Sequence, residues 1–565
     1  METRNCQNCT TSFTIQPDDF GFYTKMDVPP PTWCSSCRLF RRLSFLNWYN
    51  LYKRKCDRCQ EDIVSTHHSD KPYQVYCQSC YWADDWDGTE YAMDYDPDRN
   101  FLEQVLELRN KSHFAALESL HTSLVNTKYA NAIAYSKDSY MIFCADYIEK
   151  TAYSFILAHI KESLDCYRAK SSELCYECIG INKCYLCSHS EELDACVGVH
   201  FSRTCFGCTD CVGCVNLRNK SYCIYNVQYS KEEYFEKVKE MELDTRQGRE
   251  QVYKDALSFW QQHPYRATTG NNLNVNTTGD YVYESKNVRE GYMITSTEDS
   301  KFVSFLTLGP TKDCYDYTVW GAGAEHLYEC VTVGDGGYNN KFCMQCWPQA
   351  LDNEYCMHAV QTNNCFGCVN LKRKNYCILN KQYSKEEYLA LKEQIIESMK
   401  NNPYTDSSGK TYSYGEFFPI EFSPYTYNES VVKDFFPFTK EVALERHLPW
   451  YDKKENTYTI TMEQEDLSDT SSEVSEAITK EIMECSTCTL PYNITELEVY
   501  LLKKMNVPYP SSCWKCRQQR RFGRVNKPAL FERNCQQCGT EVLTSYAPDR
   551  PEIIYCEKCY QQSVD

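Results

Sequence analysis

Long hydrophobic runs are missing from this sequence. No run approaches the roughly 20 apolar residues that span a bilayer, and the N-terminal stretch METRNCQNCT contains no apolar signal-peptide core. In a reducing compartment cysteines persist as metal ligands or as small buried apolar residues rather than as disulfides. We therefore expect a cytoplasmic protein without a membrane partner, in which cysteine has these two roles.

Motifs that mark common catalytic sites are also missing. The sequence has no GxSxG, no P-loop, no dinucleotide fingerprint and no HExxH. Positive charge is not in excess either, because the formal net charge is −18. This balance argues against a protein whose whole surface follows a phosphate backbone, although it leaves room for local basic patches. We predict a non-enzymatic protein, and no small-molecule substrate is evident.

Cysteine and tyrosine are unusually abundant, with 36 and 46 of the 565 residues. Two sets of four CxxC pairs bracket the chain, and each cysteine of the first set lies 479 residues before one of the second. Four thiolates in two CxxC knuckles form the ligand set of a structural zinc ion, so a pair of zinc ribbons is predicted at each end, with about four Zn²⁺ ions in total. The spacing does not decide whether neighbouring or alternate pairs share an ion. The predicted ligands are Cys6, Cys9, Cys34, Cys37, Cys56, Cys59, Cys77, Cys80, Cys485, Cys488, Cys513, Cys516, Cys535, Cys538, Cys556 and Cys559.

Arginines recur with the ligands at the same offset, which indicates an internal duplication. Aromatic residues such as Phe40 and Trp48 lie between the arginines of the first copy, so bases could stack there while the cations hold phosphates. The alternative is a solvated face, or a set of arginines paired with the molecule's own carboxylates. The candidate nucleic-acid-binding residues are Arg38, Arg41, Arg42 and Arg54, with their counterparts Arg517, Arg520, Arg521 and Arg533.

The first ribbon carries further residues in a fixed pattern. Between Cys6-x2-Cys9 and Cys34-x2-Cys37 stand Phe13, Asp19, Phe22-Tyr23 and Val28-Pro29. This pattern resembles the small "probable zinc-binding" zinc-ribbon family of bacterial proteins, and the resemblance implies that neighbouring pairs share an ion in this ribbon. The second copy departs from it, because Tyr492 stands in place of Phe13. The whole chain resembles cysteine-rich zinc-ribbon proteins of candidate-phyla bacteria, a resemblance that brings no activity with it.

The middle of the chain contains a short repeat. Cysteines recur nine residues apart, and a bulky residue follows each of them. Nine residues make one short strand and a corner, so two such units would close a coil of roughly eighteen to twenty residues. Stacked coils would form a β-solenoid with an interior ladder of cysteines beside aromatic side chains. A first lobe is indicated by Cys166, Cys175, Cys184, Cys196, Cys205, Cys214 and Cys223, and a less regular second lobe by Tyr292, Phe302, Cys314, Cys330, Cys343, Cys356, Cys365 and Cys377.

Four of these cysteines invite a different interpretation. Cys205-x2-Cys208-x2-Cys211-x2-Cys214 looks like the ligand run of an iron–sulfur cluster, but the ferredoxin pattern ends in x3-Cys-Pro, which is absent. The nine-residue repeat already accounts for Cys205 and Cys214. We interpret them as part of the interior ladder, with an additional zinc site, a cluster or a disulfide as alternatives.

Both predicted lobes end alike. The segment 213–234 recurs 154 residues later, and each copy closes with a capping box, Ser230 with Glu233 and Ser384 with Glu387. In a capping box the serine accepts from a free amide and the glutamate reaches back, so a helix is predicted after each lobe. Later in the chain, MEQEDLSDTSSEVSEA is acidic and free of aromatic residues, which predicts a flexible linker.

The predicted fold class is mainly β: a two-lobed Cys/Tyr-rich β-solenoid with capping helices, flanked by zinc-ribbon pairs at both termini. The predicted segments are a zinc-ribbon pair (1–95), a helical cap (96–135), solenoid lobe 1 (136–229), helices (230–265), solenoid lobe 2 (266–383), a helix with an irregular wrap (384–460), an acidic flexible linker (461–484) and a second zinc-ribbon pair (485–565), the duplicate of 6–80.

The function that we predict from the sequence is binding of nucleic acid or of a nucleoprotein complex through the arginine-rich ribbons. An alternative is a protein-interaction scaffold built on the solenoid, and a further one is a thiol-based redox enzyme that uses the middle cysteines. Steep salt dependence of binding would favour the first, and a reactive thiol at neutral pH would favour the third. The partner's identity, the oligomeric state and the handedness of the coils lie beyond the sequence.

Overall fold

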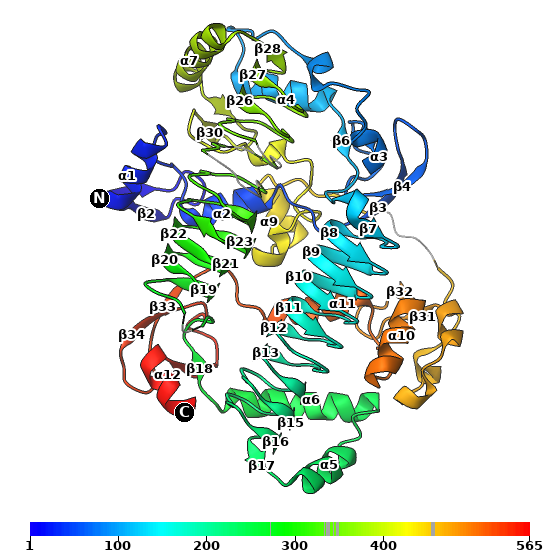
Figure 1. Ribbon diagram of the computed structural model, residues 1–565. Coiled ribbons are helices and arrows are strands. Elements are labelled where there is room, and N and C mark those ends of the chain that lie inside the picture. Colours follow the sequence, from blue (N-terminus) through cyan, green and yellow to red (C-terminus); the bar gives the residue numbers. More distant parts are fainter. Residues whose placement is uncertain are drawn as a thin grey trace.

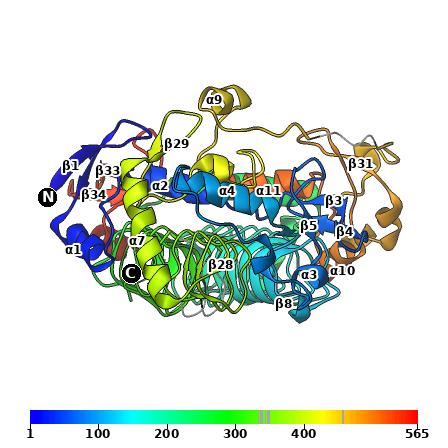
Figure 2. The same cartoon turned by 90° about the horizontal axis from the view of Figure 1, so that it is seen from above.

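Two stacks of parallel strands lie side by side, and segments from both ends of the chain pack against them (Figure 1). The computed structural model describes residues 1–271, 273–332, 334, 339–342, 344–345, 350–453 and 458–564. We call the stack from residue 124 to residue 228 lobe 1 and the stack from 279 to 382 lobe 2. Helices α2 (Ser35–Leu43), α4 (Phe101–Lys111) and α11 (Trp514–Arg524) lie on the same side of both stacks (Figure 2). Within the described part of the chain, every helix is too short or too polar to cross a bilayer.

Lobe 1 consists of strands whose partners are twelve residues apart in the sequence. Tyr140 pairs with Ala152, for example, and Phe155 pairs with Tyr167. The chain therefore completes one coil in twelve residues, and the expected coil of roughly eighteen to twenty residues is wrong. The strands are β7 (Leu124–Val125), β8 (Asn131–Lys137), β9 (Tyr140–Glu149), β10 (Ala152–Lys161), β11 (Tyr167–Glu173), β12 (Ile179–Asn182), β13 (Glu191–Asp194), β14 (Val197–His200), β15 (Thr209–Val212), β16 (Ser221–Ile224) and the antiparallel β17 (Val227–Gln228).

A period of three residues builds each coil. From Ala132 to Tyr225 every third residue has a positive φ, with glycine at only four of these positions. Left-handed residues turn the chain, so four corners fit into twelve residues. The side chain after each corner points into the coil, as the buried Ile133 and Ile142 show. The nine-residue spacing of the cysteines is three of these steps, which is why it misrepresents the length of the coil.

Cysteine lines the interior of lobe 1, but the aromatic residues beside it do not. Cys166 and Cys205 are 0% exposed and belong to the interior cluster. The bulky residue after each cysteine lies outside the coil, so Tyr185 stays 45% exposed, whereas Tyr167 is buried because Phe522 of α11 packs against it. The expected interior ladder of cysteine beside aromatic residues is therefore half wrong: the outer aromatic residues are buried only where other segments cover the lobe.

Lobe 2 has the same parallel pairing with coils of unequal length. Val282 and Ile294 are partners twelve residues apart, whereas Ser304 and Thr318 are partners fourteen residues apart. Its interior cluster includes Cys314, Cys330, Cys356, Cys365 and Cys377, while Cys343 lies outside the described residues. The strands are β19 (Gly279–Tyr283), β20 (Lys286–Arg289), β21 (Gly291–Thr295), β22 (Thr297–Lys301), β23 (Ser304–Leu308), β24 (Thr311–Lys312), β25 (Thr318–Gly321), β26 (Asn363–Phe366), β27 (Asn375–Ile378) and the antiparallel β28 (Lys381–Gln382).

A helix follows each lobe, as the capping boxes predicted. Ser230 precedes α5 (Lys231–Glu240), and its backbone N–H donates to Glu233 at 3.0 Å; Ser384 precedes α7 (Lys385–Asn401) and donates to Glu387 at the same distance. Helix α6 (Arg246–Gln261) and the short β18 (Tyr265–Arg266) then lead from α5 to lobe 2.

The segments around the lobes differ from expectation in two places. The coils begin at β7, ahead of the boundary expected at 136. Helix α4, strand β6 (Phe114–Ala115) and a 3-10 helix (His121–Ser123) precede them. The acidic segment 461–484 is not a free linker, because Leu467, Val474 and Ile478 are buried against α10 (Glu496–Met505). The segment contains few apolar residues among many acidic ones, so its composition did not indicate that it packs against the second module. The aromatic wrap before it contains β29 (Tyr404–Thr405), β30 (Thr411–Tyr412), α8 (Val432–Phe435) and α9 (Lys440–Glu445).

The two ends of the chain form the same series of elements. We call residues 1–81 the first module and residues 483–564 the second module. The first module contains β1 (Glu2–Asn5), β2 (Ser12–Ile15), α1 (Pro17–Lys25), α2, β3 (Tyr52–Lys55), β4 (Asp62–Ser65), β5 (Val75–Tyr76) and α3 (Gln78–Tyr81). The second contains β31 (Met483–Glu484), β32 (Pro491–Tyr492), α10, α11, β33 (Phe531–Asn534), β34 (Glu541–Thr544), β35 (Ile554–Tyr555) and α12 (Glu557–Val564). The bounds of β3, β4 and β5 recur in β33, β34 and β35 at the offset of 479.

Candidate metal centres and the arginine clusters beside them

The sixteen cysteines of the terminal CxxC pairs form four separate groups. Each group takes two neighbouring pairs, so the structure brings together pairs one with two and three with four, and not alternate pairs. Within each group the four sulfur atoms lie within 4.8 Å of one another. The groups are Cys6, Cys9, Cys34 and Cys37; Cys56, Cys59, Cys77 and Cys80; Cys485, Cys488, Cys513 and Cys516; and Cys535, Cys538, Cys556 and Cys559.

The geometry of these groups fits a tetrahedral metal ion. A zinc–sulfur bond of about 2.3 Å gives a regular tetrahedron with edges of about 3.8 Å. The distance between the second and third sulfur atoms is 3.8 Å for Cys9 and Cys34, and it is 3.9, 3.8 and 3.8 Å in the other three groups. Each group could therefore hold one metal ion.

Backbone amides favour the thiolate form of the first sulfur atom in these groups. The N–H of Cys34 donates to Cys6 Sγ at 3.3 Å, and the equivalent amides of Cys77 and Cys513 donate at 3.2 Å to the first sulfur of their groups. Burial raises the pKa of Cys485, but the amides of its loop outweigh burial and lower the pKa to about 6. Metal ligands must be deprotonated, so this arrangement suits a cysteine that binds metal.

Two histidines near the second group are not part of it. The group at Cys56 consists of cysteines alone, in keeping with the tyrosine and alanine that stand at the positions of His67 and His68 in the second module. Both histidines are nevertheless buried, at 2% and 7% exposure. His67 Nδ1 lies 3.2 Å from the hydroxyl of Tyr73, and its ring stacks on Tyr425 of the aromatic wrap. His68 likewise stacks on Tyr451, so both histidines contact aromatic residues and neither belongs to the four-cysteine group.

The cysteines inside the lobes form no comparable group among the described residues. The run Cys205, Cys208, Cys211 and Cys214 is fully buried, and the thiol of Cys214 faces the carbonyl oxygen of Val212 at 3.4 Å. All cysteines that the structure describes are free thiols. The interpretation of the run as an interior ladder is favoured over a metal site or a disulfide.

The arginines of α2 point into the protein and are held by its own carboxylates. Arg38 Nε lies 3.0 Å from Asp316 of lobe 2, and Arg42 Nη1 lies 2.9 Å from the same carboxylate. Arg41 binds Glu329 of lobe 2 at 2.6 Å and Glu416 of the wrap at 3.0 Å. All three arginines are at most 1% exposed.

The arginines of α11 are held in the same way by lobe 1. Arg517 Nε and Arg521 Nη2 both lie 2.8 Å from Asp165, and both arginines are 2% exposed. Arg520 and Arg521 bind Glu177 at 2.7 and 3.0 Å. Burial raises the pKa of Glu177, but Arg521, Arg520 and Arg517 outweigh burial and lower the pKa, so this carboxylate is charged.

The candidate nucleic-acid-binding residues are therefore mostly unavailable to a phosphate. Arg38, Arg41, Arg42, Arg517 and Arg521 are buried in ion pairs, which realises the alternative of arginines paired with the molecule's own carboxylates. Arg54 binds Asp57 at 2.8 Å, and Arg533 donates to the backbone carbonyl groups of residues 547 and 552. The side chain of Arg520 remains 45% exposed. Sequence spacing predicted the clusters but not their direction.

The two modules contact the lobes crosswise. Helix α2 of the first module binds lobe 2, while β5 of the same module pairs with β6, just ahead of lobe 1. Helix α11 of the second module binds lobe 1, while β35 pairs with β18, just ahead of lobe 2. The carboxylates that receive the helices are also related, because Asp165 and Glu177 are one coil apart, as are Asp316 and Glu329. Asn131 of lobe 1 donates to the backbone carbonyl of Asn47 at 3.0 Å, and the hydroxyl of Tyr281 in lobe 2 accepts from the backbone N–H of Asn526 at 3.0 Å, so each module contacts both lobes.

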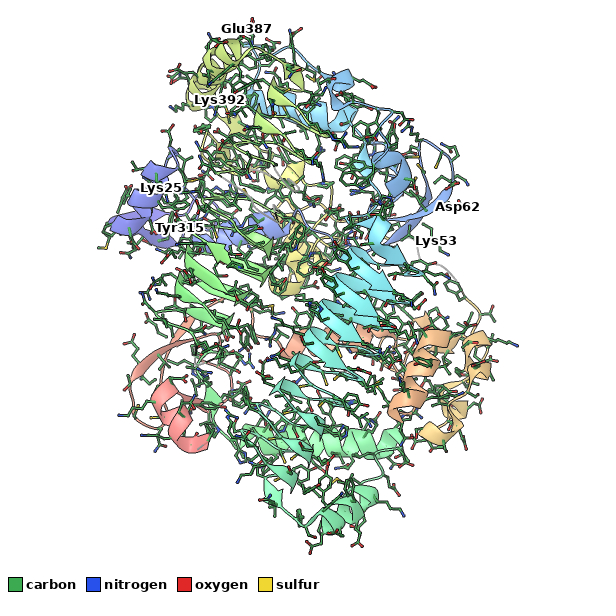
Figure 3. The ribbon with its side chains drawn as sticks, viewed as in Figure 1. Lys25, Lys53, Asp62, Tyr315, Glu387 and Lys392 are labelled. Atoms are coloured by element: carbon green, nitrogen blue, oxygen red, sulfur yellow. The ribbon has the colours of Figure 1, made fainter. Side chains whose placement is uncertain are left out.

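The two ends of the first module lie on opposite sides of the molecule (Figure 3). Figure 3 shows Lys25 of α1 beside Tyr315 of lobe 2, and the structure records an ion pair between Lys25 and Asp313. Lys53 and Asp62, on the β3–β4 hairpin of the same module, lie on the opposite side of the molecule near β7 (Figure 3). One module therefore extends across both lobes.

The receiving carboxylates were missed in the sequence. All four occupy left-handed corner positions, with φ between 53° and 59°. The signal that could have found them is the twelve-residue period, which places Asp165 above Glu177 on one edge of the coil. The comparisons add no family: no protein-family model matches the chain, and a search of curated proteins finds no match either.

Proposed function

We propose that this chain is a non-enzymatic zinc protein in which two zinc-ribbon pairs, with four Zn²⁺ ions in total, lock two β-solenoid lobes into one binding scaffold. Four thiolates close the coordination sphere of each ion, so no position is left for a substrate. Small folds such as the β3–β4 hairpin have little apolar core, and a structural metal supplies the stability that they lack.

The observation that carries the proposal is the crosswise docking of the modules. The four-cysteine groups that contain Cys34 and Cys513 each lie at the start of the helix whose arginines bind the opposite half of the molecule. Fixing Cys37 and Cys516 in a metal site also fixes the residues that follow them, Arg38 and Arg517, and so sets the direction of both ion-pair clusters. Metal binding and lobe assembly are thus coupled through one turn of helix.

The rival functions have less support from the geometry. Binding of nucleic acid through the arginine clusters requires cations that the protein's own carboxylates already hold. A thiol-based enzyme requires an accessible thiolate, and Cys166 and Cys205 inside lobe 1 are 0% exposed, with pKa values that burial and neighbouring thiols raise. Gel-shift assays at two salt concentrations and thiol labelling at neutral pH test these two rivals directly.

Metal analysis of matched variants tests the proposal. Purified protein should carry about four zinc ions. Cys34→Ser should remove one ion and increase hydrogen exchange in α2 while α11 stays protected, and Cys513→Ser should do the reverse. Cys175→Ser, which changes an interior cysteine of lobe 1, is the control and should keep all four ions. Iron as the main metal, or fewer than two zinc ions after a metal-sparing preparation, would contradict the zinc assignment. Loss of an ion without a local change in exchange would contradict the coupling.

A further inference from the structure

A cavity of about 420 Å³ lies between the two lobes. Strands β10 to β13 of lobe 1 form one wall and β19 and β21 of lobe 2 form the other, and residues of α6 and of the second module also line the cavity. Cavities that bind small organic molecules are commonly about 300 to 1,000 Å³. The space is therefore large enough for an organic ligand and larger than a simple ion needs.

The lining of this cavity is positive in a protein that is strongly negative. Seven arginine or lysine side chains face five carboxylates there, although the whole chain has a formal net charge of −18. Apolar and aromatic residues complete the wall, among them Ile181, Met293, Trp260 and Tyr281. A local excess of cations beside apolar surface favours a molecule with an anionic group and an organic body.

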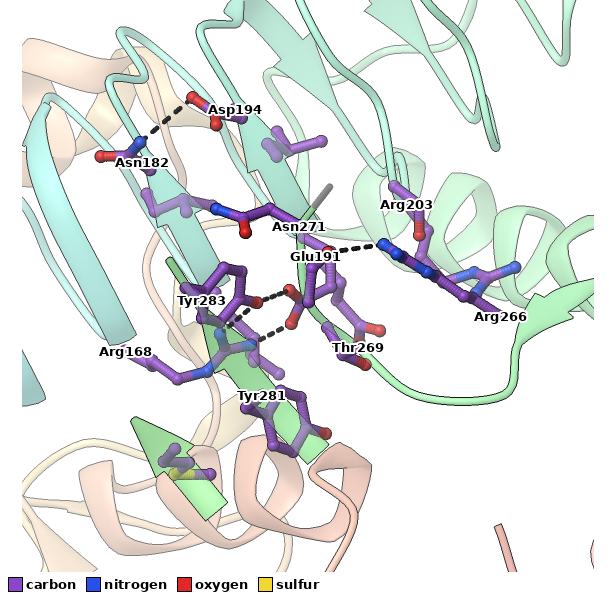
Figure 4. A pocket seen from close by; sticks show the side chains of 18 of the residues that line it. Arg168, Asn182, Glu191, Asp194, Arg203, Arg266, Thr269, Asn271, Tyr281 and Tyr283 are labelled. Atoms are coloured by element: carbon purple, nitrogen blue, oxygen red, sulfur yellow. Dashed lines mark hydrogen bonds and ion pairs between the residues drawn. The ribbon is translucent and has the colours of Figure 1, made fainter. Parts of the chain in front are cut away.

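Most of these cations already have partners. Arg168 binds Glu192 and donates to the hydroxyl of Tyr283 at 2.9 Å, and Tyr283 in turn donates to Glu192 at 2.9 Å (Figure 4). Arg524 binds Glu191. Arg266, on the far side of the cavity from Arg168 in Figure 4, binds Glu557 of α12. These cations are therefore already paired with groups of the protein itself.

Arg203 differs from its neighbours. It lines the cavity and is 6% exposed, yet its Nε and Nη2 atoms have no hydrogen-bond partner among the residues that the structure describes. Its guanidinium group lies on the ring of Tyr265, 3.4 Å from the ring centre, so the group is held in a fixed orientation. Two buried guanidinium nitrogens without an acceptor are costly, and proteins keep such groups where an anion supplies the missing hydrogen bonds.

We propose that the cavity is a binding site for a small organic anion whose carboxylate or phosphate group is held by Arg203. The ring of Tyr265 orients the guanidinium, and the apolar residues of the two lobes contact the body of the ligand. This inference goes beyond the proposed zinc scaffold, and it is tested on protein whose metal content has been measured first, so that the two proposals fail separately.

Calorimetric titration with matched probes tests the site. Adenosine monophosphate and 4-hydroxybenzoate represent the two anionic groups, and adenosine and 4-hydroxybenzamide are their uncharged counterparts. At least one anion should bind one to one, and its uncharged counterpart should bind about tenfold more weakly or worse, because charge-assisted hydrogen bonds are lost. Inorganic phosphate alone should bind more weakly than the better organic anion, because it leaves the apolar wall unused.

The variant Arg203→Met separates a binding role from a structural one. It should weaken binding of the anion about tenfold or more and raise the melting temperature of the ligand-free protein, because an unpaired buried charge is removed. Arg289→Gln, at an exposed arginine on the outside of lobe 2, is the control and should change neither. The proposal is overturned if neither anion binds to the wild-type protein or if binding survives in Arg203→Met. A fall in the melting temperature of Arg203→Met, or a failure to fold, also overturns it, because the arginine would then be structural.

Discussion

Asp165→Asn should release the second module from lobe 1 without removing a metal ion. The Asp165 side chain is 0% exposed and accepts from Arg517 Nε and Arg521 Nη2, both at 2.8 Å. Removing one partner of a buried ion pair costs about 3 to 5 kcal/mol. The low end applies here, because Arg517 keeps Glu498 and Arg521 keeps Glu177. We therefore expect a loss of about 3 kcal/mol.

Hydrogen exchange of α11 is the suitable assay, because a chain with several parts need not unfold in one step. A loss of about 3 kcal/mol corresponds to an opening of α11 that is about 100 times more frequent, since about 1.4 kcal/mol is one factor of ten. Exchange in α2 should stay unchanged, whereas the matching variant Asp316→Asn should act on α2 and leave α11 unaffected. Both variants should keep the zinc content of the wild-type protein.

The control is Asp138→Asn, at another left-handed corner of lobe 1. Asp138 accepts from Asn126 and forms no ion pair among the described residues. Its replacement should leave exchange in α11 within a factor of about two, as expected for a change outside a buried network. If Asp165→Asn folds and α11 exchanges as slowly as in the wild-type protein, the ion pairs do not hold the second module against lobe 1, and the proposed role of crosswise docking is refuted.

Two further predictions concern the lobe interior and pH. Cys175→Ser should change the free energy of unfolding by less than about 1 kcal/mol in chemical denaturation. Ser163 occupies the same position one coil earlier, where its hydroxyl donates to the carbonyl of Lys161 at 2.9 Å and accepts from the amide of Cys175. A larger loss would show that the interior does not accept a hydroxyl at position 175. Burial lowers the pKa of His67 well below its usual value. Below about pH 6.5 the unfolded chain therefore binds a proton that the folded chain does not, and the free energy of unfolding decreases as the pH is lowered. Between about pH 7.5 and pH 5.5 the wild-type protein should lose about 1.4 kcal/mol more than His67→Tyr, which carries the residue of the second module; equal losses at equal metal content would contradict this assignment.

The sequence alone determined the features that depend on neighbouring residues. The CxxC spacing identified all sixteen cysteines of the four groups, but it left open which pairs combine. The resemblance of the first ribbon to a known family implied that neighbouring pairs share a site, and the grouping of Cys6 with Cys34 agrees with it. The capping boxes at Ser230 and Ser384 predicted the start of two helices, since their bonds span three residues.

The predictions from sequence were wrong where one local pattern is compatible with several three-dimensional arrangements. Cysteines nine residues apart fit a coil of twelve residues as well as one of eighteen, because every third side chain points inward in the coil that forms. The acidic composition of 461–484 concealed Leu467 and Ile478, which become apolar contacts only when α10 lies beside them. Period and composition cannot show which surface a segment meets.

The tertiary structure decided the direction of the arginines and the existence of the cavity. Arg41 and Glu329 are 288 residues apart, and Arg521 and Asp165 are 356 residues apart, so no window of sequence contains both partners. The same cations would serve a phosphate if they faced solvent, and they serve the fold because each helix is pressed against a carboxylate of the opposite half of the chain. Arg203 likewise becomes a candidate ligand-binding residue only because lobe 2 lies opposite it and encloses a cavity in front of its two unpaired nitrogens.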